Sequence, residues 1–181
     1  MNNNKKPAKV KNNTGNFEWY TPTYITDAVK TFYKGEIDLD PLSCEFANQF
    51  VGAREFYSIE DDGFKQPWEG NIWINPPYQT EYMTKTLDKI EDVCRINPIK
   101  NIQICMICNN STETKWFQRA LVFAKAVCFL NKRVKFIDQN GVVQKSPLQG
   151  QVLFYFSSNL RNHIDFSKTL NNELGRVLIN T

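Results

Sequence analysis

Residues 70–78 have the sequence Gly70-Asn-Ile-Trp-Ile-Asn75-Pro-Pro-Tyr78, an apolar run that ends at two successive prolines. Proline has no backbone N–H to donate to a sheet ladder, so the chain has to leave the sheet directly after this run. The pattern predicts a buried strand over residues 70–74, followed by a conformationally rigid loop.

The loop over residues 75–78 presents acceptors rather than donors. Its two prolines fix φ and remove two N–H groups, which leaves backbone carbonyls beside the side-chain carbonyl of Asn75. Such a cluster suits an exocyclic NH2 group, which has two protons to donate, and the ring of Tyr78 offers a face on which a planar base can stack. The alternative explanation of these four residues is that they end a strand, form a tight turn and place an aromatic residue at the surface.

Helical and strand patterns alternate along the rest of the chain. We expect a helix that begins at Thr21 as its N-cap, with Pro22 in the first turn, and ends at Gly35. Further helices are expected over 80–95 and 114–124, with a helical turn or two at 44–49. Strands are expected over 36–40, 55–58, 101–108, 126–130, 135–137 and 151–156.

This alternation predicts an α/β layered fold with a largely parallel sheet. In such sheets ligands bind beyond the carboxyl ends of the strands. Asp40 and Asn75 both stand at the end of an expected strand, so we expect the functional site to lie where they meet.

The chain has 181 residues, of which 41% are hydrophobic and 23% charged, the composition of one globular domain rather than a disordered chain. Residues 1–15 differ: they are Asn-rich with four lysines, and they predict a flexible basic arm ahead of a single domain over 16–181. The arm either contacts phosphates or is a solvated tail. No apolar run approaches the ~20 residues that span a bilayer, and the first residues lack a secretory signal, so we expect no membrane segment.

Five cysteines form an odd set, which favours reduced thiols. Cys105 and Cys108 have a CxxC spacing, but they lie inside an apolar run, and the single histidine, His163, is distant in sequence. We expect core cysteines and no metal site; metal or redox chemistry is the alternative.

The loop at 75–78 resembles the Asp/Asn/Ser-Pro-Pro-Tyr/Phe/Trp motif of amino-group methyltransferases that use S-adenosylmethionine. Further blocks narrow the resemblance to the phage-type (Dam-like) DNA adenine-N6 methyltransferase family, over residues 18–157. In chain order these blocks are Glu18-Trp-Tyr-Thr-Pro22, Asp38-Leu-Asp-Pro-Leu-Ser43, Asp61-Asp-Gly-Phe64 with Trp68 and Gly70, Thr112-Glu-Thr-Lys-Trp-Phe117 and Lys132-Arg-Val-Lys-Phe136.

The resemblance implies a Rossmann-like methyltransferase sheet, mostly parallel with an antiparallel C-terminal hairpin, and S-adenosylmethionine as the cofactor. It implies that Asp40 takes the cofactor's ammonium group, that Asp62 accepts from its hydroxyls or adenine amine, and that Phe64 stacks on its adenine. The other implied cofactor-binding residues are Trp19, Tyr20, Thr21, Pro22, Pro41, Ser43 and Asn75. Residues 40–44 contain no glycine, whereas many such enzymes have a glycine-rich loop there.

The resemblance also implies catalysis by Asn75, Pro76, Pro77 and Tyr78 on an adenine flipped out of the double helix. Acceptors at Asn75 and Pro76 would hold the amine for direct in-line methyl transfer, without a covalent enzyme intermediate. The substrate is then double-stranded DNA, and the expected setting is the cytoplasm of a bacterial host, where methylation protects against restriction.

Basic residues that could contact DNA occur in the block at 132–136 and on the expected helix that includes the end of the block at 112–117. They are Lys115, Arg119, Lys132, Arg133 and Lys135, and each alone is more often a solvated charge than a phosphate contact. Other substrates with an NH2 group, RNA or a protein amide, fit the same loop. A catalytically silent nucleic-acid-binding module of this fold is the remaining alternative.

Overall fold

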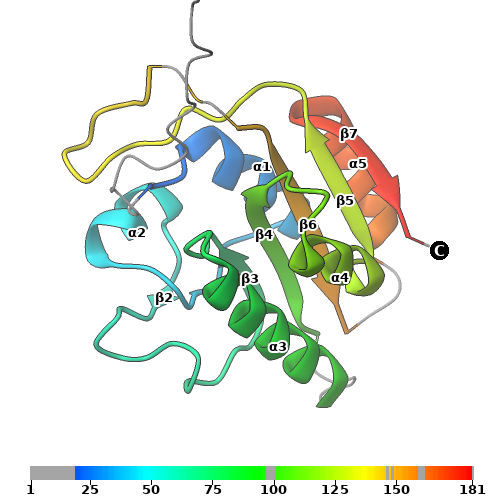
Figure 1. Cartoon of the computed structure of the whole chain (residues 1–181), viewed down its shortest axis with the longest axis horizontal. Coiled ribbons are helices and arrows are strands. Elements are labelled where there is room, and N and C mark those ends of the chain that lie inside the picture. Colours follow the sequence, from blue (N-terminus) through cyan, green and yellow to red (C-terminus); the bar gives the residue numbers. More distant parts are fainter. Residues whose placement is uncertain (1–18, 97–100, 146, 148, 159–161, 181) are drawn as a thin grey trace, which may run out of the picture.

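The computed structural model describes residues 19–96, 101–145, 147, 149–158 and 162–180, and within them seven strands form one sheet (Figure 1). The predicted arm over residues 1–15 lies outside the described residues. The strands are β1 (Leu39–Asp40), β2 (Glu55–Phe56), β3 (Asn71–Ile74), β4 (Gln103–Asn109), β5 (Ala126–Leu130), β6 (Gln151–Ser157) and β7 (Gly175–Ile179). Their order across the sheet is β2-β1-β3-β4-β6-β5-β7.

The sheet is mixed, and the expectation of a largely parallel sheet is not confirmed. The pairings β1 with β2, β1 with β3 and β3 with β4 are parallel. The pairings β4 with β6, β5 with β6 and β5 with β7 are antiparallel. β6 is buried along its whole length, and a strand buried on both faces has the continuous apolar pattern that is typical of parallel strands, so its sequence does not reveal its direction.

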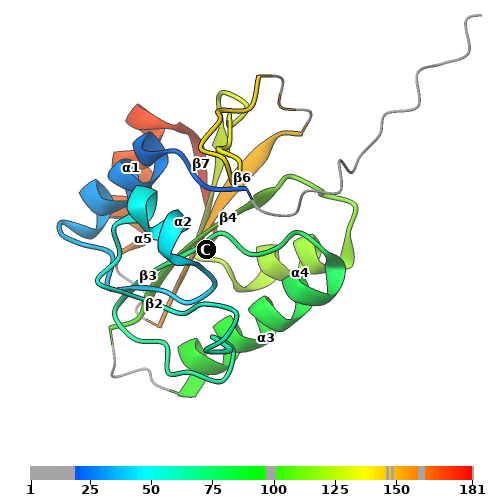
Figure 2. The ribbon, with the colours of Figure 1, turned by 90° about the vertical axis from the view of Figure 1, so that its left-hand side faces the viewer.

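Helices cover both faces of the sheet (Figure 2). On one face lie α1 (Thr23–Tyr33), α2 (Glu45–Val51) and α5 (His163–Glu173), and on the other lie α3 (Thr80–Ile96) and α4 (Lys115–Phe123). Side chains of a strand alternate between faces, so Trp73 faces the α1 side while Ile72 and Ile74 face the α3 side. The protein therefore has three layers with a separate apolar core on each side of the sheet.

Several element boundaries differ from the sequence-based expectations. α1 begins at Thr23 with Pro22, not Thr21, at its N-cap, and Lys34 rather than Gly35 takes the left-handed conformation, with φ 57°, at its end. The strand expected over 135–137 is wrong: Ile137 forms only isolated bridges to Tyr20 and Val143. α5 and β7 were not predicted.

Cys105 and Cys108 lie on β4 and belong to different cores, because residues three apart on a strand point to opposite faces. They therefore cannot share a metal ion, and no group of three potential metal-ligating side chains occurs in the described part of the chain. Burial raises the pKa of the Cys105 thiol to about 12, which keeps it protonated. Among the described helices, none is both long and apolar enough to cross a bilayer.

Candidate active site at the carboxyl ends of the parallel strands

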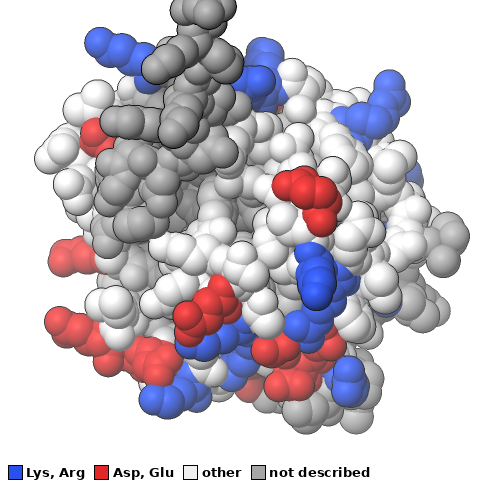
Figure 3. All heavy atoms as spheres, in the orientation of Figure 1, with Lys and Arg blue, Asp and Glu red and all other residues white. Residues whose placement is uncertain are grey.

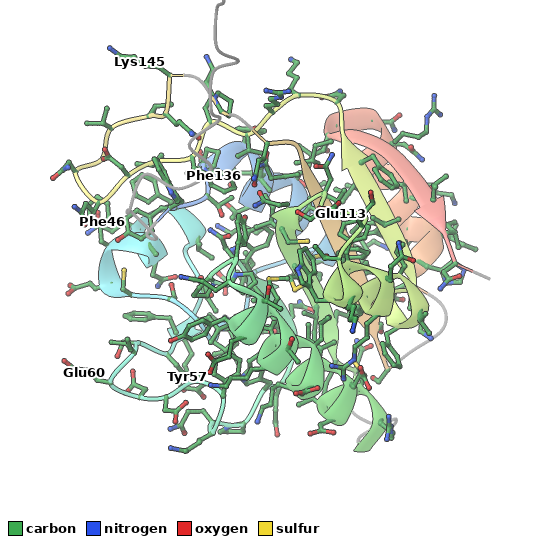
Figure 4. All side chains as sticks on the ribbon, in the orientation of Figure 1. Phe46, Tyr57, Glu60, Glu113, Phe136 and Lys145 are labelled. Atoms are coloured by element: carbon green, nitrogen blue, oxygen red, sulfur yellow. The ribbon has the colours of Figure 1, made fainter. Side chains whose placement is uncertain are left out.

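A cavity of about 910 Å³ lies at the carboxyl ends of β1, β2, β3 and β4, within the size range typical of ligand sites. Segments that are distant in sequence meet around it. Figure 4 labels two of its lining residues, Tyr57 from the loop after β2 and Phe136 from the segment between β5 and β6. The location agrees with the expectation that Asp40 and Asn75 meet at one edge of the sheet, since both line this cavity.

The loops that follow β1 and β2 form one wall of the cavity. Tyr57 donates its N–H to the carbonyl of Asp40 at 3.1 Å, and its own carbonyl accepts from the N–H of Ser43 at 2.9 Å. Gly63 lies against Pro41 so closely that a Cβ at position 63 would be 1.8 Å from the Pro41 carbonyl oxygen. The wall therefore depends on a residue without a side chain at position 63.

Asp40 ends β1 with its side chain turned into the protein, where only 3% of the residue is exposed. Its Oδ1 has no hydrogen-bond partner among the described residues. Burial raises the pKa of this carboxyl group from an ordinary 3.8 to about 7, because the charged form loses its hydration. A buried carboxyl group with a free oxygen is ready to accept a cationic or N–H-bearing ligand.

Unpaired polar groups are concentrated in this cavity. In the described part of the chain, the buried side-chain atoms without a hydrogen-bond partner are Thr21 Oγ1, Asp40 Oδ1, Ser43 Oγ and Trp73 Nε1. All four residues line the cavity. Leaving a buried polar group unpaired costs about 1–3 kcal/mol, so this cavity is where a polar ligand or ordered water would find four free partners.

The side chain of Asn75 is held at both of its polar atoms. Its Nδ2 donates to the carbonyl of Trp19 at 2.7 Å, and its Oδ1 accepts from the hydroxyl of Tyr78 at 3.0 Å. A carbonyl oxygen has two lone pairs, so Oδ1 keeps one for a further donor. The amide is therefore fixed in orientation while one acceptor position stays available.

Tyr78 is more enclosed than a surface aromatic residue. It is half-buried against both cores, its ring meets that of Phe136 edge to face at 6.5 Å, and burial raises the pKa of its hydroxyl group well above the ordinary value. Pro76 is buried, Pro77 is half-buried, and both line the cavity together with Tyr78. The loop predicted from its prolines is thus part of the cavity wall.

The segment that follows β2 adds Asp62 and Phe64 to the lining. Asp62 has φ 50°, a conformation that Asp adopts more readily than most residues, and it pairs with Lys65 at 2.7 Å. The hydrogen bond from Lys65 lowers the pKa of its carboxyl group. Phe64 packs beside Trp68 with ring centroids 6.4 Å apart.

The structure brings most of the predicted cofactor-binding residues together. Trp19, Tyr20, Thr21, Asp40, Pro41, Ser43, Asp62, Phe64 and Asn75 all line the cavity, whereas Pro22 does not. Trp73 was missed because an aromatic residue inside an apolar run is typical of a core. Its position two residues before Asn75, at the end of the predicted strand, is the signal that could have found it.

A polar region of the cavity at the end of β4 was also not predicted from the sequence. It includes Asn109, Ser111, Gln149 and Gln151. Gln151 is buried, donates to Asn109 Oδ1 at 3.3 Å and accepts from the N–H of Val134 at 3.1 Å. This glutamine therefore holds the segment between β5 and β6 against the end of β4.

The predicted DNA-contacting residues lie outside the cavity lining. Lys132, Arg133 and Lys135 are exposed on the segment after β5, with Val134 buried between them. Figure 3 shows Lys and Arg along the upper rim of this face, where that segment runs, and mixed charges lower down.

The other two predicted DNA-contacting residues lie on α4. Lys115 is exposed at its first turn. Arg119 is engaged within the protein, since it lies 2.7 Å from Asp88 and donates to Glu91 at 2.6 Å, which joins α4 to α3. Of the two, Lys115 is the one whose charge faces solvent.

A family model described as DNA N-6-adenine-methyltransferase (Dam) matches residues 8–176. The chain belongs to the Dam family. The DNA N-6-adenine-methyltransferase of Haemophilus phage HP1 (strain HP1c1) is 25% identical over 122 residues, which cover 66% of this chain and 66% of that relative. The resemblance seen in the sequence is thereby confirmed.

In this Dam family member, the blocks that carry the resemblance converge on the cavity. It is lined by Trp19–Thr21 from the first block, by residues of the blocks at 38–43, 61–64 and 75–78, and by Thr114 and Trp116. Of the block at 132–136, only Phe136 reaches the lining. Blocks spread over more than a hundred residues of sequence therefore surround one site.

We predict that Gly63→Ala destabilises this Dam family member by about 1–3 kcal/mol, because the added Cβ collides with the Pro41 carbonyl. Urea denaturation measures the change. Gly35→Ala is the matched control, since a Cβ at position 35 has no neighbour within 4 Å. Equal unfolding midpoints for the two variants would contradict the tight contact between these loops.

We predict that Asp40 makes the ligand-free protein less stable as pH rises from about 4 to about 7. In that range the native carboxyl group, with its pKa raised to about 7, keeps a proton that the unfolded chain has lost. Stability falls with pH wherever the native state binds more protons. Asp40→Asn should remove this slope and stabilise the protein at pH 8 by a few kcal/mol.

The measurement is the free energy of unfolding from pH 4 to pH 8 for the wild type and the variant. Asp62→Asn is the control, because the pKa of Asp62 is lowered and its contribution is lost only at more acidic pH. A difference between wild type and Asp40→Asn that does not vary with pH would show that Asp40 is charged throughout.

Proposed function

We propose that the protein transfers a methyl group from S-adenosylmethionine to the exocyclic N6 of adenine in double-stranded DNA. The observation that carries the proposal is the meeting, in one cavity, of the Asn-Pro-Pro-Tyr loop with four unpaired buried polar groups. Membership of the Dam family supplies the reaction class. RNA and protein amides also have an NH2 group, so the choice of DNA adenine rests on the family.

The residues of the cavity fit the proposed cofactor. S-adenosylmethionine supplies an electrophilic methyl group on its sulfonium when bound. Asp40 would accept from the ammonium group of its methionine end, a charge-assisted hydrogen bond, and the hydroxyls of Thr21 and Ser43 supply further polar partners. Trp19, Tyr20 and Pro41 would enclose this end, whereas Pro22 lies outside the cavity lining.

The segment after β2 would hold the adenosine end. Asp62 would accept from the ribose hydroxyls or the adenine amine, and Phe64 would stack on the adenine ring. Both residues line the cavity on the wall formed with the loop after β1, next to the proposed methionine site.

The loop at 75–78 would hold the target amine. The available lone pair of Asn75 Oδ1 and the carbonyl of Pro76 accept its two protons and turn the nitrogen lone pair toward the methyl group. Bonds to Tyr78 and Trp19 fix the Asn75 amide before the substrate arrives, and Pro77 keeps the loop rigid. Transfer is then direct, with no covalent enzyme intermediate, while the ring of Tyr78 contacts the flipped base.

The exposed basic residues would contact the DNA backbone. Lys132, Arg133 and Lys135 lie on one segment whose Phe136 lines the cavity, so contacts there would place the duplex beside the site. Lys115 would add a contact from α4. Arg119 would have to leave Asp88 and Glu91 to reach DNA, which makes it the weakest of the proposed contacts.

The proposed setting is the cytoplasm of a bacterial host, where methylation would protect DNA from restriction. This part of the proposal rests on the phage relative and on the family resemblance. The direct test of the reaction is incubation with labelled S-adenosylmethionine and unmethylated DNA, followed by nucleoside mass spectrometry. Labelled N6-methyladenine is the expected product. Label in RNA or protein alone would identify a different acceptor, and cofactor binding without any transfer would identify a silent module.

We predict that Asn75→Ala lowers the rate of adenine methylation by at least about 100-fold, because one acceptor of the amine is lost. Cofactor affinity, measured by calorimetry, should change much less. Tyr78→Phe keeps the ring but removes the bond to Asn75 and should give an intermediate rate. The control is Asn110→Ala, an exposed amide outside the cavity lining. Near-normal turnover by Asn75→Ala would exclude its proposed role.

We predict that the double variant Lys132→Gln/Lys135→Gln weakens DNA binding and reduces the slope of log affinity against log salt by roughly 2, one unit per lost phosphate contact. Binding to a fixed duplex is measured at several salt concentrations. Lys168→Gln/Arg176→Gln, two exposed cations on α5 and β7, is the control with the same charge loss. An identical slope for both double variants would remove the basic segment from the DNA interface.

A further inference from the structure

Trp73 has a buried indole N–H that nothing in the described structure accepts. The residue is 0% exposed on β3, it lines the cavity, and its Nε1 is without a partner. Indole nitrogen can only donate, so the unpaired N–H offers the protein nothing that a phenylalanine ring would not offer at lower cost. The question is then whether a ligand in the cavity supplies the acceptor that this N–H lacks.

Trp68 provides the contrast within the same chain. It is 2% exposed, and its Nε1 donates to the carbonyl of Gly63 at 2.8 Å. The fold thus satisfies a buried indole where the role is structural. The unpaired N–H of Trp73 differs in that it belongs to a residue that lines the cavity.

Trp73 and Asp40 are neighbours on adjacent strands. Leu39 pairs with Ile72 in the parallel register of β1 and β3, so the next residue on each strand, Asp40 and Trp73, lie side by side about 5 Å apart between backbones. Neither Asp40 Oδ1 nor Trp73 Nε1 has a partner, so the two atoms do not pair with each other. A carboxyl oxygen and an indole N–H therefore stand next to each other, each available to a third group.

Among the described residues, those that line the cavity and carry a charge are Asp40, Asp62 and Lys85, and none of them is a buried cation that could hold a ligand carboxylate. Lys85 is exposed and pairs with Glu81 at 2.8 Å. In the described part of the cavity, the donors that a carboxylate beside Asp40 can meet are therefore neutral N–H and O–H groups.

We infer that Trp73 Nε1 donates a hydrogen bond to the α-carboxylate of the cofactor, while Asp40 accepts from its α-ammonium group. This inference rests on the proposed function and extends it to a residue outside the sequence motifs. A zwitterionic amino-acid end matches the pair, since it brings one cationic donor and one anionic acceptor close together. Trp73 thereby makes the site selective for ligands that carry the carboxylate.

The test compares three ligands by calorimetry with wild type and Trp73→Phe. S-adenosylhomocysteine has both groups, its decarboxylated analogue keeps only the amine, and 5′-methylthioadenosine has neither. Trp73→Phe should lower the affinity for S-adenosylhomocysteine at least about tenfold, as expected for a lost hydrogen bond to a charged group. The affinities for the other two ligands should stay within about twofold of the wild-type values. Trp68→Phe is the matched control and should not discriminate among the ligands.

An equal loss of affinity for all three ligands in Trp73→Phe would overturn the inference, because it would indicate that the substitution acts by changing the packing of the site. Failure of the wild type to bind S-adenosylhomocysteine would instead reject the proposed function. If Trp73→Phe does not fold, a second measurement uses the wild type. It follows the NMR resonances of the indole N–H groups of the four tryptophans.

Variants Trp19→Phe, Trp68→Phe and Trp116→Phe assign the Trp73 resonance by elimination. S-adenosylhomocysteine should shift this resonance downfield, and the decarboxylated analogue should not. The same shift with both ligands would overturn the inference.

Discussion

The burial of Asp40 is the constraint on which the site depends. A carboxyl group with a free oxygen and a pKa raised to about 7 is unfavourable in an unliganded protein, and the fold keeps it at the end of β1. Trp73 lies beside it on β3, and the loops after β1 and β2 close around it through Gly63. The fold gives up stability at this point, and in the proposed function the cofactor's ammonium group would restore it.

The second organising feature is the joining of distant segments above the sheet. Tyr20 exchanges two backbone hydrogen bonds with Ile137, at 2.8 and 2.9 Å, and Phe46 packs against the Tyr20 ring at 5.2 Å. Trp19 accepts from Asn75 in the same region. The segment that carries the basic residues is thus connected, through residues 19–20, to both the proposed cofactor site and the loop at 75–78.

Local patterns made part of this structure predictable. The apolar run before two prolines predicted β3 and its loop, and the meeting of Asp40 with Asn75 follows from the way parallel strands end at one edge. Nonlocal facts were not predictable: the antiparallel direction of β6, the acidic partners of Arg119 on α3 and the unpaired indole of Trp73 depend on residues far away in sequence. α5 was not predicted because its sequence pattern is weakly amphipathic and no side chain caps its start.

The most direct measurement is a crystal structure of the protein with S-adenosylhomocysteine bound. We predict that the ammonium group lies about 3 Å from Asp40 Oδ1 and that the sulfur faces the loop at 75–78, with the four unpaired polar groups now satisfied. A ligand whose amino-acid end lies outside the cavity, with Asp40 Oδ1 and Trp73 Nε1 still unpaired, would contradict the assignment of this cavity as the cofactor site.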